Sequence, residues 1–248
     1  MKRLALSFAL GLGLATSAAA TDIDQMTDAE REAFGAEVRA YLLENPEVLI
    51  EAYGVLEQRQ AQAEAVADRN LAQANMDALY NDGHSWVGGN PDGDITIVEF
   101  MDYRCGYCKR AFPEVEELVE TDGNIRFIVK EFPILGEASV LASRFAIAAH
   151  QLYDDETYKL VHDTLMEFRG DITPDSLAQL ADTFGLDSDA ILERATSNEV
   201  TAVLQANMEL AQILQISGTP TFVVEDEMVR GYMPLAAMQQ TVEEQRAD

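Results

Sequence analysis

Cys105 and Cys108 are the only cysteines in this 248-residue chain, and they lie three residues apart in the segment DYRCGYCKR (102–110). Two thiols at this spacing could form a structural disulfide, supply half of a metal site or act as a redox pair. A structural disulfide stabilises mainly by closing a long loop, and this pair would close almost none. The stability gained from closing so short a loop is too small to explain the pair as a structural disulfide.

A metal site is poorly supported by the residue types. Zinc needs four protein ligands, or three and a water molecule. His84, His150 and His162 are scattered along the chain and provide no second ligand pair at metal-ligand spacing. We predict no metal and no cofactor other than the redox-active Cys105–Cys108 disulfide. Binding of Cu(I), an ion that favours thiolate ligands, is the alternative.

The residues around the cysteine pair favour redox chemistry. The segment 94–103 is β-branched and apolar and predicts a strand, while 108–120 has apolar residues every three to four positions and predicts a helix. Cys105 would then lie at a helix N-terminus, where unpaired N–H groups and the helix dipole stabilise a thiolate. The pKa of the first cysteine in such motifs falls to roughly 3.5–7.5. Cys108, one turn later, should point inward as the resolving thiol.

Residues 1–20, MKRLALSFALGLGLATSAAA, have the layout of a secretory signal peptide. Lys2 and Arg3 precede an apolar run that ends in small residues, so we expect cleavage after Ala20. A membrane anchor is the alternative, but the apolar run is short for a bilayer span of about 20 residues. We therefore predict a periplasmic protein, in a compartment where disulfides persist.

The chain is strongly acidic, with a formal net charge of −27. Removal of the two basic residues in 1–20 would leave 15 basic against 44 acidic residues. This balance argues against nucleic acid, which needs a basic surface, and against anionic membrane surfaces. We interpret the acidity as an aid to solubility, with a preference for basic or unfolded clients as a weaker alternative.

The segment FMDYRCGYCK resembles the active site of the thioredoxin superfamily, in its exported DsbA-like branch. The similarity covers about 81–248 and includes GNPDGDITIVEF, IRFIVKEFPILG and SGTPTFVV. The dipeptide Gly106-Tyr107 is similar to that of the DsbC and ScsC members more than to that of DsbA itself. The resemblance implies an α/β thioredoxin fold with an inserted helical domain, and a thiol–disulfide oxidoreductase whose dipeptide tunes the thiolate.

The resemblance also implies a cis-proline loop opposite the cysteines, followed by an antiparallel hairpin and a closing helix. The segment 217–232 supplies the residues, so we expect a cis Thr219–Pro220 bond and a strand at 221–224. In the family this loop leaves the backbone before the proline free to pair with a client strand, and keeps the sulfurs from capturing metal. Thr219 and Pro220, with Gly106 and Tyr107, are the expected substrate-binding residues.

Glu99 stands six residues before Cys105, among apolar neighbours. In thioredoxin-like proteins a buried acid at this offset carries the proton of the resolving thiol. Burial raises the pKa of a carboxyl group towards neutrality, which suits a proton relay, so we favour this role over a solvent-facing strand glutamate. Lys130 and Glu131 could also lie near the site, but we interpret them as a solvated pair.

The resemblance places an inserted helical domain between the two halves of the site. The 111 residues between Cys108 and Pro220 exceed what a bare thioredoxin fold needs. Periodicity and capping residues predict helices at 137–152, at 155–168, from Thr173-Pro174 onward, and from Asp187 or Ser188 to about 214. We therefore place the insertion at about 137–214, after a strand at 124–135.

Residues 21–80 form an N-terminal helical extension outside the main resemblance, whereas 81–248 form the catalytic domain. We expect helix over 28–60 with a break near Asn45-Pro46, then a helix over 57–80 about 36 Å long. Its thin apolar face needs a partner. The extension is either an oligomerisation stalk, as in trimeric ScsC-like and dimeric DsbC-like proteins, or packs on its own catalytic domain; we favour a homo-oligomer.

The expected function is protein thiol–disulfide exchange, with a tilt towards disulfide isomerase. The expected partners are unfolded or misoxidised exported proteins and a membrane redox partner. A DsbA-type oxidase and a Cu(I) metallochaperone are alternative functions that would use the same two cysteines. The third alternative is a holdase with an inert cysteine pair, which predicts that Cys105→Ser leaves client protection intact.

Overall fold

A five-stranded mixed sheet lies at the centre of the catalytic part of the chain. The computed structural model describes residues 23–247, so the predicted signal peptide (1–20) lies outside the described residues. The strand order is β1-β3-β2-β4-β5, in which β2 and β3 are parallel and all other neighbours antiparallel. The strands are β1 (Trp86–Gly89), β2 (Ile95–Met101), β3 (Ile125–Glu131), β4 (Thr221–Val224) and β5 (Glu227–Arg230).

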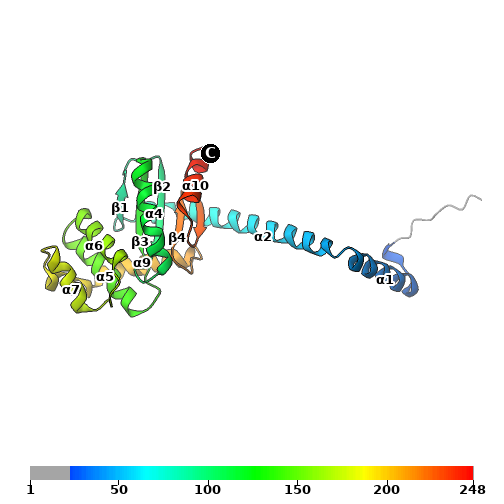
Figure 1. Cartoon of the computed structure of the whole chain (residues 1–248), viewed down its shortest axis with the longest axis horizontal. Helices are drawn as coiled ribbons and strands as arrows, with labels where there is room; N and C mark the ends of the chain where they lie inside the picture. Colours follow the sequence, from blue (N-terminus) through cyan, green and yellow to red (C-terminus); the bar gives the residue numbers. More distant parts are fainter. Residues whose placement is uncertain (1–22, 248) are drawn as a thin grey trace, which may run out of the picture. The chain divides into compact units, whose positions relative to one another are not determined.

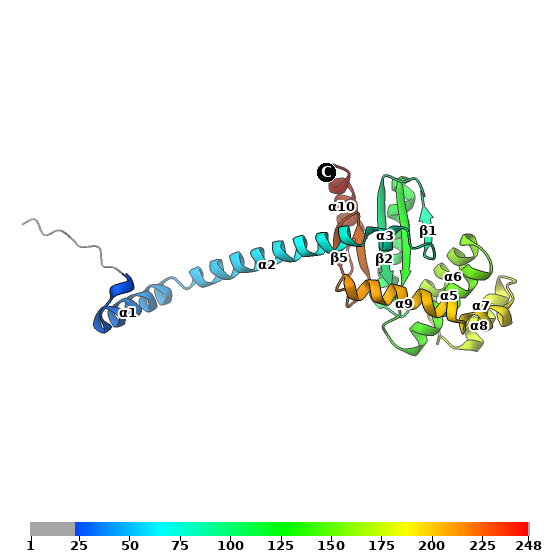
Figure 2. The ribbon, with the colours of Figure 1, turned by 180° about the vertical axis from the view of Figure 1, so that it is seen from behind.

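Helices cover both faces of this sheet and fill the interval between β3 and β4 (Figures 1 and 2). They are α1 (Asp28–Glu44), α2 (Glu47–Ala74), α3 (Met76–Tyr80), α4 (Gly106–Asp122), α5 (Glu137–Leu152), α6 (Asp155–Glu167), α7 (Pro174–Thr183), α8 (Ser188–Ala195), α9 (Asn198–Ile213) and α10 (Leu235–Ala247), after a short 3-10 turn at Ile23–Gln25.

The two faces of β2 belong to two separate cores, because side chains alternate along a strand. Ile97 and Met101 pack in the core that contains both cysteines and the apolar side of α4. Val98 and Phe100 face the opposite core, with residues of α3 and α9. A residue of β2 therefore reaches the cysteine side only at an odd-numbered position.

Helix α4 positions the cysteine pair. Its buried residues Ala111, Val115 and Leu118 follow helical spacing and pack on the sheet. The helix ends at Asp122 and is capped by Gly123, whose φ of 70° is the left-handed conformation that favours glycine at this position. Cys105 is the N-cap residue, as the sequence predicted.

The inserted helices confirm most of the predicted elements. Helices α5, α6 and α7 occupy the predicted segments, and α7 begins with the Thr173 cap and Pro174 at its first turn. The single long helix predicted up to about 214 is wrong, since the chain forms α8 and α9 there. The Ser197 side chain accepts a hydrogen bond from the Val200 N–H and starts α9 as a new helix.

Three other boundaries differ from prediction. The strand predicted at 124–135 ends at Glu131, because Phe132 begins the connection to α5. The helix predicted over 57–80 is interrupted at Asn75, whose side chain donates to the Leu71 carbonyl. Strand β1 was not predicted; its four residues are too few for a periodic pattern.

The chain divides into two compact units between Arg59 and Gln60. In the first, α1 begins with a capping box in which Thr27 and Glu30 exchange hydrogen bonds. The predicted break near Asn45-Pro46 is confirmed, and no residue of α1 is buried.

The second unit begins with the C-terminal half of α2, which packs on the catalytic fold. Ala72 and Leu79 are fully buried in the same core as Val98 and Phe100. Asp68 accepts two hydrogen bonds from Arg230 on β5. Residues 60–80 are therefore an integral part of this unit.

Candidate active site

Cys105 lies where the loop after β2 enters α4, and it faces the loop before β4. Its Sγ atom is 3.1 Å from the Thr219 carbonyl oxygen, and its side chain is nearly buried. The Thr219–Pro220 bond is cis, as predicted. Two segments more than 100 residues apart in the sequence thus meet at one sulfur atom.

The surroundings of Cys105 stabilise its thiolate. Hydrogen bonding from the Cys108 side chain contributes most, and the side chain of Thr219 and the backbone N–H groups of Cys108 and Tyr107 add to it. Burial opposes these contacts, yet the pKa of Cys105 falls to about 5. At neutral pH this sulfur is therefore a thiolate, the nucleophilic form of cysteine.

Cys108 is the opposite case. It has no exposed surface, and burial raises the pKa of its thiol well above the ordinary value. Its hydrogen bond to Cys105 and the nearby Glu99 carboxylate raise this pKa further. Both cysteines are free thiols in this structure, and only one of them is poised to react.

Glu99 is buried on the cysteine side of the sheet. It lies at the centre of β2, paired with Val129 of β3 and Phe222 of β4, and it is 3% exposed. Burial contributes most to raising the pKa of Glu99 to about 8, followed by the charge of Cys105. Its Oε1 atom has no hydrogen-bond partner, so this carboxyl group is free to exchange a proton with a nearby thiol.

The prediction that Lys130 and Glu131 form a solvated pair is wrong, since both are buried. They are neighbours on β3 and therefore face opposite sides of the sheet. The Lys130 Nζ atom donates to Asp82 Oδ2 at 2.5 Å. Glu131 lies on the cysteine side, but it binds hydroxyl groups rather than either sulfur.

Glu131 is held by three hydroxyl donors. Tyr103 and Tyr158 donate to Oε1 and Ser143 donates to Oε2, each at 2.7 Å. Burial raises the pKa of Glu131 to about 7 despite these bonds. His162 is buried beside Tyr103, and burial lowers its pKa to about 3. This network anchors the residue two positions before Cys105.

Asp102 is a site residue that the sequence reasoning missed. Its side chain is fully buried and accepts hydrogen bonds from the backbone N–H groups of Arg104, Ile134 and Leu135 at 2.7, 2.8 and 3.0 Å. The bond to Arg104, two residues later, is an Asx turn, a signal readable from an aspartate before a tight loop. Asp102 thereby fixes the loop that carries Cys105.

The other predicted substrate-binding residues surround Cys105. Gly106 and Tyr107 are exposed at the start of α4, and the Tyr107 ring stacks on Tyr232 with 6.5 Å between centroids. Thr219 is half-buried and Pro220 buried. An aromatic pair and an open backbone segment thus border the reactive sulfur.

A metal centre is not evident within residues 23–247, where no three side chains of the metal-ligating types converge. His84 and His150 lie beside the carboxylates of Asp82 and Asp155, respectively. Across the same residues, no helix has both the length and the apolar character needed to cross a membrane.

Comparison with known proteins identifies two regions. Residues 96–243 match the DSBA-like thioredoxin domain family, and residues 30–63 match the copper resistance protein ScsC N-terminal domain. Disulfide bond formation protein D of Bacillus subtilis is 26% identical over 171 residues, which cover 64% of this chain and 76% of that protein. The chain is also 30% identical to a Na(+)/H(+) antiporter NhaA 1 of Salinispora arenicola, but it spans only 24% of that protein's length.

Solved structures agree with this assignment. A thioredoxin-like oxidoreductase from Silicibacter pomeroyi DSS-3 is 42% identical, with a TM-score of 0.66 over 70% of this chain and 99% of that one. Proteus mirabilis ScsC in a transitional conformation is 29% identical, with a TM-score of 0.64 over 90% of this chain and 98% of that one. The domain match covers more than half of the sequence, so this chain belongs to the DSBA-like thioredoxin domain family and is a thiol–disulfide oxidoreductase of the DsbA/ScsC type.

Proposed function

We propose that this protein exchanges disulfides with exported client proteins through Cys105, and that its principal net reaction is isomerisation. The observation that carries the exchange chemistry is the contrast between two neighbouring thiols. Cys105 is a thiolate at neutral pH beside an accessible backbone segment, whereas Cys108 is protonated and has no exposed surface.

In the first step the Cys105 thiolate attacks one sulfur of a client disulfide. A mixed disulfide forms between Cys105 and the client, and the second client sulfur leaves as a thiolate. The exposed Tyr107 ring and the backbone at Thr219 are placed to hold the client segment. No external electron carrier is consumed in this step, because one disulfide replaces another.

Two outcomes follow from the mixed disulfide. If a different client thiolate attacks the client sulfur bound to Cys105, a new client disulfide forms, Cys105 leaves as a thiolate and the client is isomerised. If Cys108 attacks the Cys105 sulfur instead, the client leaves as a dithiol and the Cys105–Cys108 disulfide forms. The balance between these routes decides between isomerase and reductase, and the second route run in reverse is oxidation.

Glu99 is proposed to accept the Cys108 proton in the second route. The charge of the Cys105 thiolate is one cause of its raised pKa. That charge disappears when Cys105 enters the mixed disulfide, so the pKa of Glu99 then falls. Its carboxylate form becomes available at the step in which Cys108 must lose a proton.

The N-terminal extension supports isomerisation through a homo-oligomer. Its exposed apolar side chains have no contacts that bury them within their own unit; the larger ones include Phe34, Tyr41, Leu43, Ile50 and Tyr53. Such side chains are normally covered by a partner. An assembly would hold several reactive thiols around one client and let it react repeatedly.

We further propose that the protein works in the periplasm and is recharged by a membrane redox partner. Similarity to a periplasmic thioredoxin-like protein from Salmonella enterica serovar Typhimurium, 29% identical over 70% of this chain, supports this location. The Cys105–Cys108 disulfide would be the only redox-active group, and the protein would carry no resident metal. We propose no nucleic acid partner.

The decisive experiment compares the mature chain with a form that begins at Gln60. This cut retains Ala72 and Leu79, which are fully buried, whereas a start at Asn81 would remove both from the core. We expect both forms to reduce insulin at similar rates, but only the longer form to reactivate scrambled ribonuclease efficiently. Equal reactivation by both would exclude an isomerase built on the extension.

Copper binding is a second candidate, because residues 30–63 match a domain named for copper resistance. A metallochaperone would use both sulfurs as ligands, so Cys105→Ser and Cys108→Ser would weaken Cu(I) binding alike. Disulfide exchange predicts asymmetry instead, with mixed disulfides accumulating only in Cys108→Ser. A titration with a Cu(I) indicator dye beside a thiol-trapping assay separates these functions.

A further inference from the structure

Basic side chains are concentrated beside the reactive cysteine of a strongly acidic protein. Arg104 directly precedes Cys105 in the sequence, and Lys109 lies one turn further along, on α4. Arg169 follows α6 in the sequence and lies close enough to lower the pKa of Lys109, as does Arg104, although burial is the larger cause. Three cations thus gather within one region.

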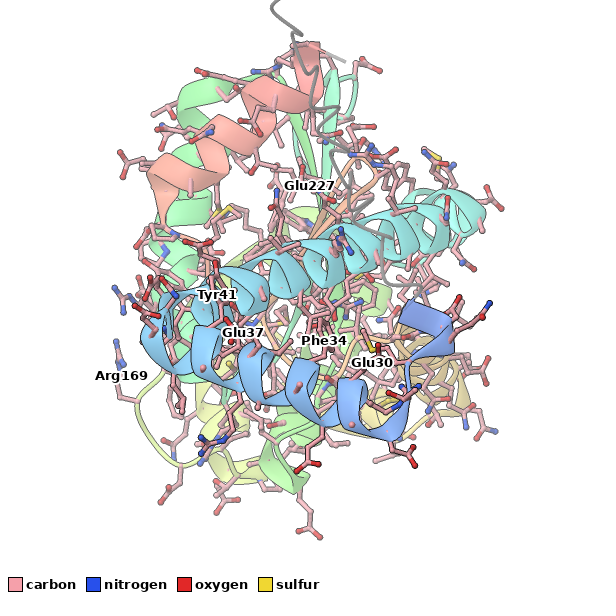
Figure 3. All side chains as sticks on the ribbon, turned by 90° about the vertical axis from the view of Figure 1, so that its right-hand side faces the viewer. Glu30, Phe34, Glu37, Tyr41, Arg169 and Glu227 are labelled. Atoms are coloured by element: carbon pink, nitrogen blue, oxygen red, sulfur yellow. The ribbon has the colours of Figure 1, made fainter. Side chains whose placement is uncertain are left out.

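These cations line a pocket of about 250 Å³ next to the cysteine loop. Its walls come from the residues flanking Cys105 and from the loop after α6; the lining residues include Tyr103, Arg104, Lys109, Arg169, Gly170 and Asp171. Figure 3 shows Arg169 extending outward from its loop. Asp171 is the one acidic lining residue, so the pocket keeps an excess of positive charge.

The two arginines of this pocket have no carboxylate partners. Most other basic side chains of the same unit form ion pairs, as Arg230 does with Asp68 and Arg246 does with Asp94 and Asp122. Within the described chain, neither Arg104 nor Arg169 forms an ion pair or a side-chain hydrogen bond. Both guanidinium groups are exposed and free to bind an anion.

Lys109 supports the pocket rather than competing for the ligand. Its Nζ atom donates to the carbonyl groups of Leu165, Met166 and Phe168, at 2.9, 2.9 and 2.8 Å. These contacts satisfy the C-terminal end of α6 and fix the start of the loop that carries Arg169. The arrangement is therefore built into the fold.

We propose that Arg104 and Arg169 form a carboxylate-binding surface that selects client segments with acidic residues next to the reacting cysteine. This inference rests on the proposed exchange reaction at Cys105. A guanidinium group binds a carboxylate through paired N–H donors. The net charge of −27 repels acidic clients elsewhere, so a local positive surface would direct them to the thiolate.

Model peptides can test the selection on the full mature chain. Three peptide disulfides would share one aromatic leaving thiol and differ only in the two residues beside the cysteine: glutamates, glutamines or lysines. Stopped-flow release of the leaving thiol from the reduced protein gives each rate. We expect the acidic peptide to react roughly threefold to tenfold faster than the neutral one at low salt, with the difference disappearing near 0.5 M salt.

Variants assign the effect to the pocket. Arg104→Gln with Arg169→Gln should bring the acidic-to-neutral ratio close to one, whereas Asp171→Asn should increase it. The neutral peptide corrects for any change in the reactivity of Cys105 itself. A matched control, Arg59→Gln with Arg194→Gln, changes the net charge equally at one exposed and one half-buried site outside the pocket and should preserve the ratio.

The outcomes separate this inference from the proposed function. A ratio near one in the wild-type protein, or a ratio that survives in the Arg104→Gln/Arg169→Gln variant, would overturn the carboxylate surface while leaving exchange intact. Failure of all three peptides to react would overturn the exchange reaction itself.

Discussion

The two units of this chain treat apolar and charged side chains in opposite ways. In α1 no residue is buried, and Phe34 and Tyr41 are 49% and 55% exposed. The catalytic unit, in contrast, buries the charged residues Glu99, Asp102, Lys130 and Glu131, each at 3% exposure or less. Figure 3 labels exposed residues of α1, including Phe34 and Tyr41.

This contrast separates what each unit needs. Burying a charged or polar group is costly unless hydrogen bonds or ion pairs compensate, so the catalytic unit must be well packed to hold the Cys105 thiolate and the buried Glu99. Exposed apolar residues on a helix contribute little without a partner. The residues around the two thiols therefore all lie within one unit, whereas the apolar side chains of α1 are left exposed in the other.

The largest expected effect is the loss of exchange in Cys105→Ser. Removing the nucleophile should lower the rate of insulin reduction by about a thousandfold or more. Cys108→Ser should retain the first step and accumulate mixed disulfides, which non-reducing gels after acid quenching would reveal. If both variants accumulated mixed disulfides to a similar extent, the two thiols would be equivalent and the proposed difference between them would be wrong.

Asp82→Asn should destabilise the catalytic unit strongly. Lys130 has no exposed side-chain surface, and its Nζ atom lies 2.5 Å from Asp82 Oδ2. Removing one partner leaves a buried charge unpaired, which costs about 3–5 kcal/mol. Urea unfolding monitored by Trp86 fluorescence would measure this loss.

The ion pair between Arg69 and Asp226, which is more exposed than the Asp82–Lys130 pair, supplies the control for that measurement. Its atoms are 3.3 Å apart and the arginine side chain is 51% exposed. Asp226→Asn should therefore cost less than about 1 kcal/mol. Equal losses in the Asp82 and Asp226 variants would show that burial does not distinguish the two pairs.

Glu99→Gln should stabilise the reduced protein, by an amount that depends on pH. The folded pKa of about 8 lies above the ordinary value of 4.5, so the folded state holds the proton more tightly. The wild-type protein has this stability in full below pH 4.5 and loses it as the pH rises towards 8. At pH 7 the loss is roughly 3 kcal/mol, which glutamine would restore.

The same variant separates a proton carrier from a merely structural acid. We expect Glu99→Gln to slow release of the client from the mixed disulfide while leaving the alkylation rate of Cys105 nearly unchanged. Denaturant midpoints measured at pH 4 and pH 7 provide the stability comparison. Identical midpoint differences at both pH values would contradict a raised pKa for Glu99.

Much of the catalytic unit could be predicted because its signals are local. The cysteine pair, the strand before it and the helix after it specify Cys105 at a helix N-terminus, and the resemblance supplied the loop at Pro220. The burial of Glu99 followed from its apolar neighbours. In each case the residues that decide the structure lie within a few positions of one another or share a family motif.

The buried polar residues could not be predicted, because their partners come from distant segments. Lys130 pairs with Asp82, 48 positions away, and Glu131 receives hydroxyl donors from Tyr103 and Tyr158. Without these partners, two adjacent charges on a strand indicate solvent exposure. The short strand β1 had too few residues for a periodic signal.

The smallest expected effect on stability comes from the first unit. Phe34→Glu with Tyr41→Glu changes side chains that are already half exposed, so the unfolding free energy of the catalytic unit should shift by less than about 0.5 kcal/mol. If these residues form an interface between copies, the same variant should dissociate the assembly and reduce ribonuclease reactivation. Sedimentation velocity and insulin reduction, measured on one sample, would test both expectations.

A matched variant strengthens this test. Glu37→Gln with Glu44→Gln alters charges on the same helix without removing apolar surface, and should leave the assembly intact. An unchanged sedimentation coefficient in the Phe34/Tyr41 variant would mean that these apolar side chains are not covered by another copy. Because we expect insulin reduction to need only the catalytic unit, its persistence would attribute any loss of isomerisation to assembly rather than to damaged chemistry.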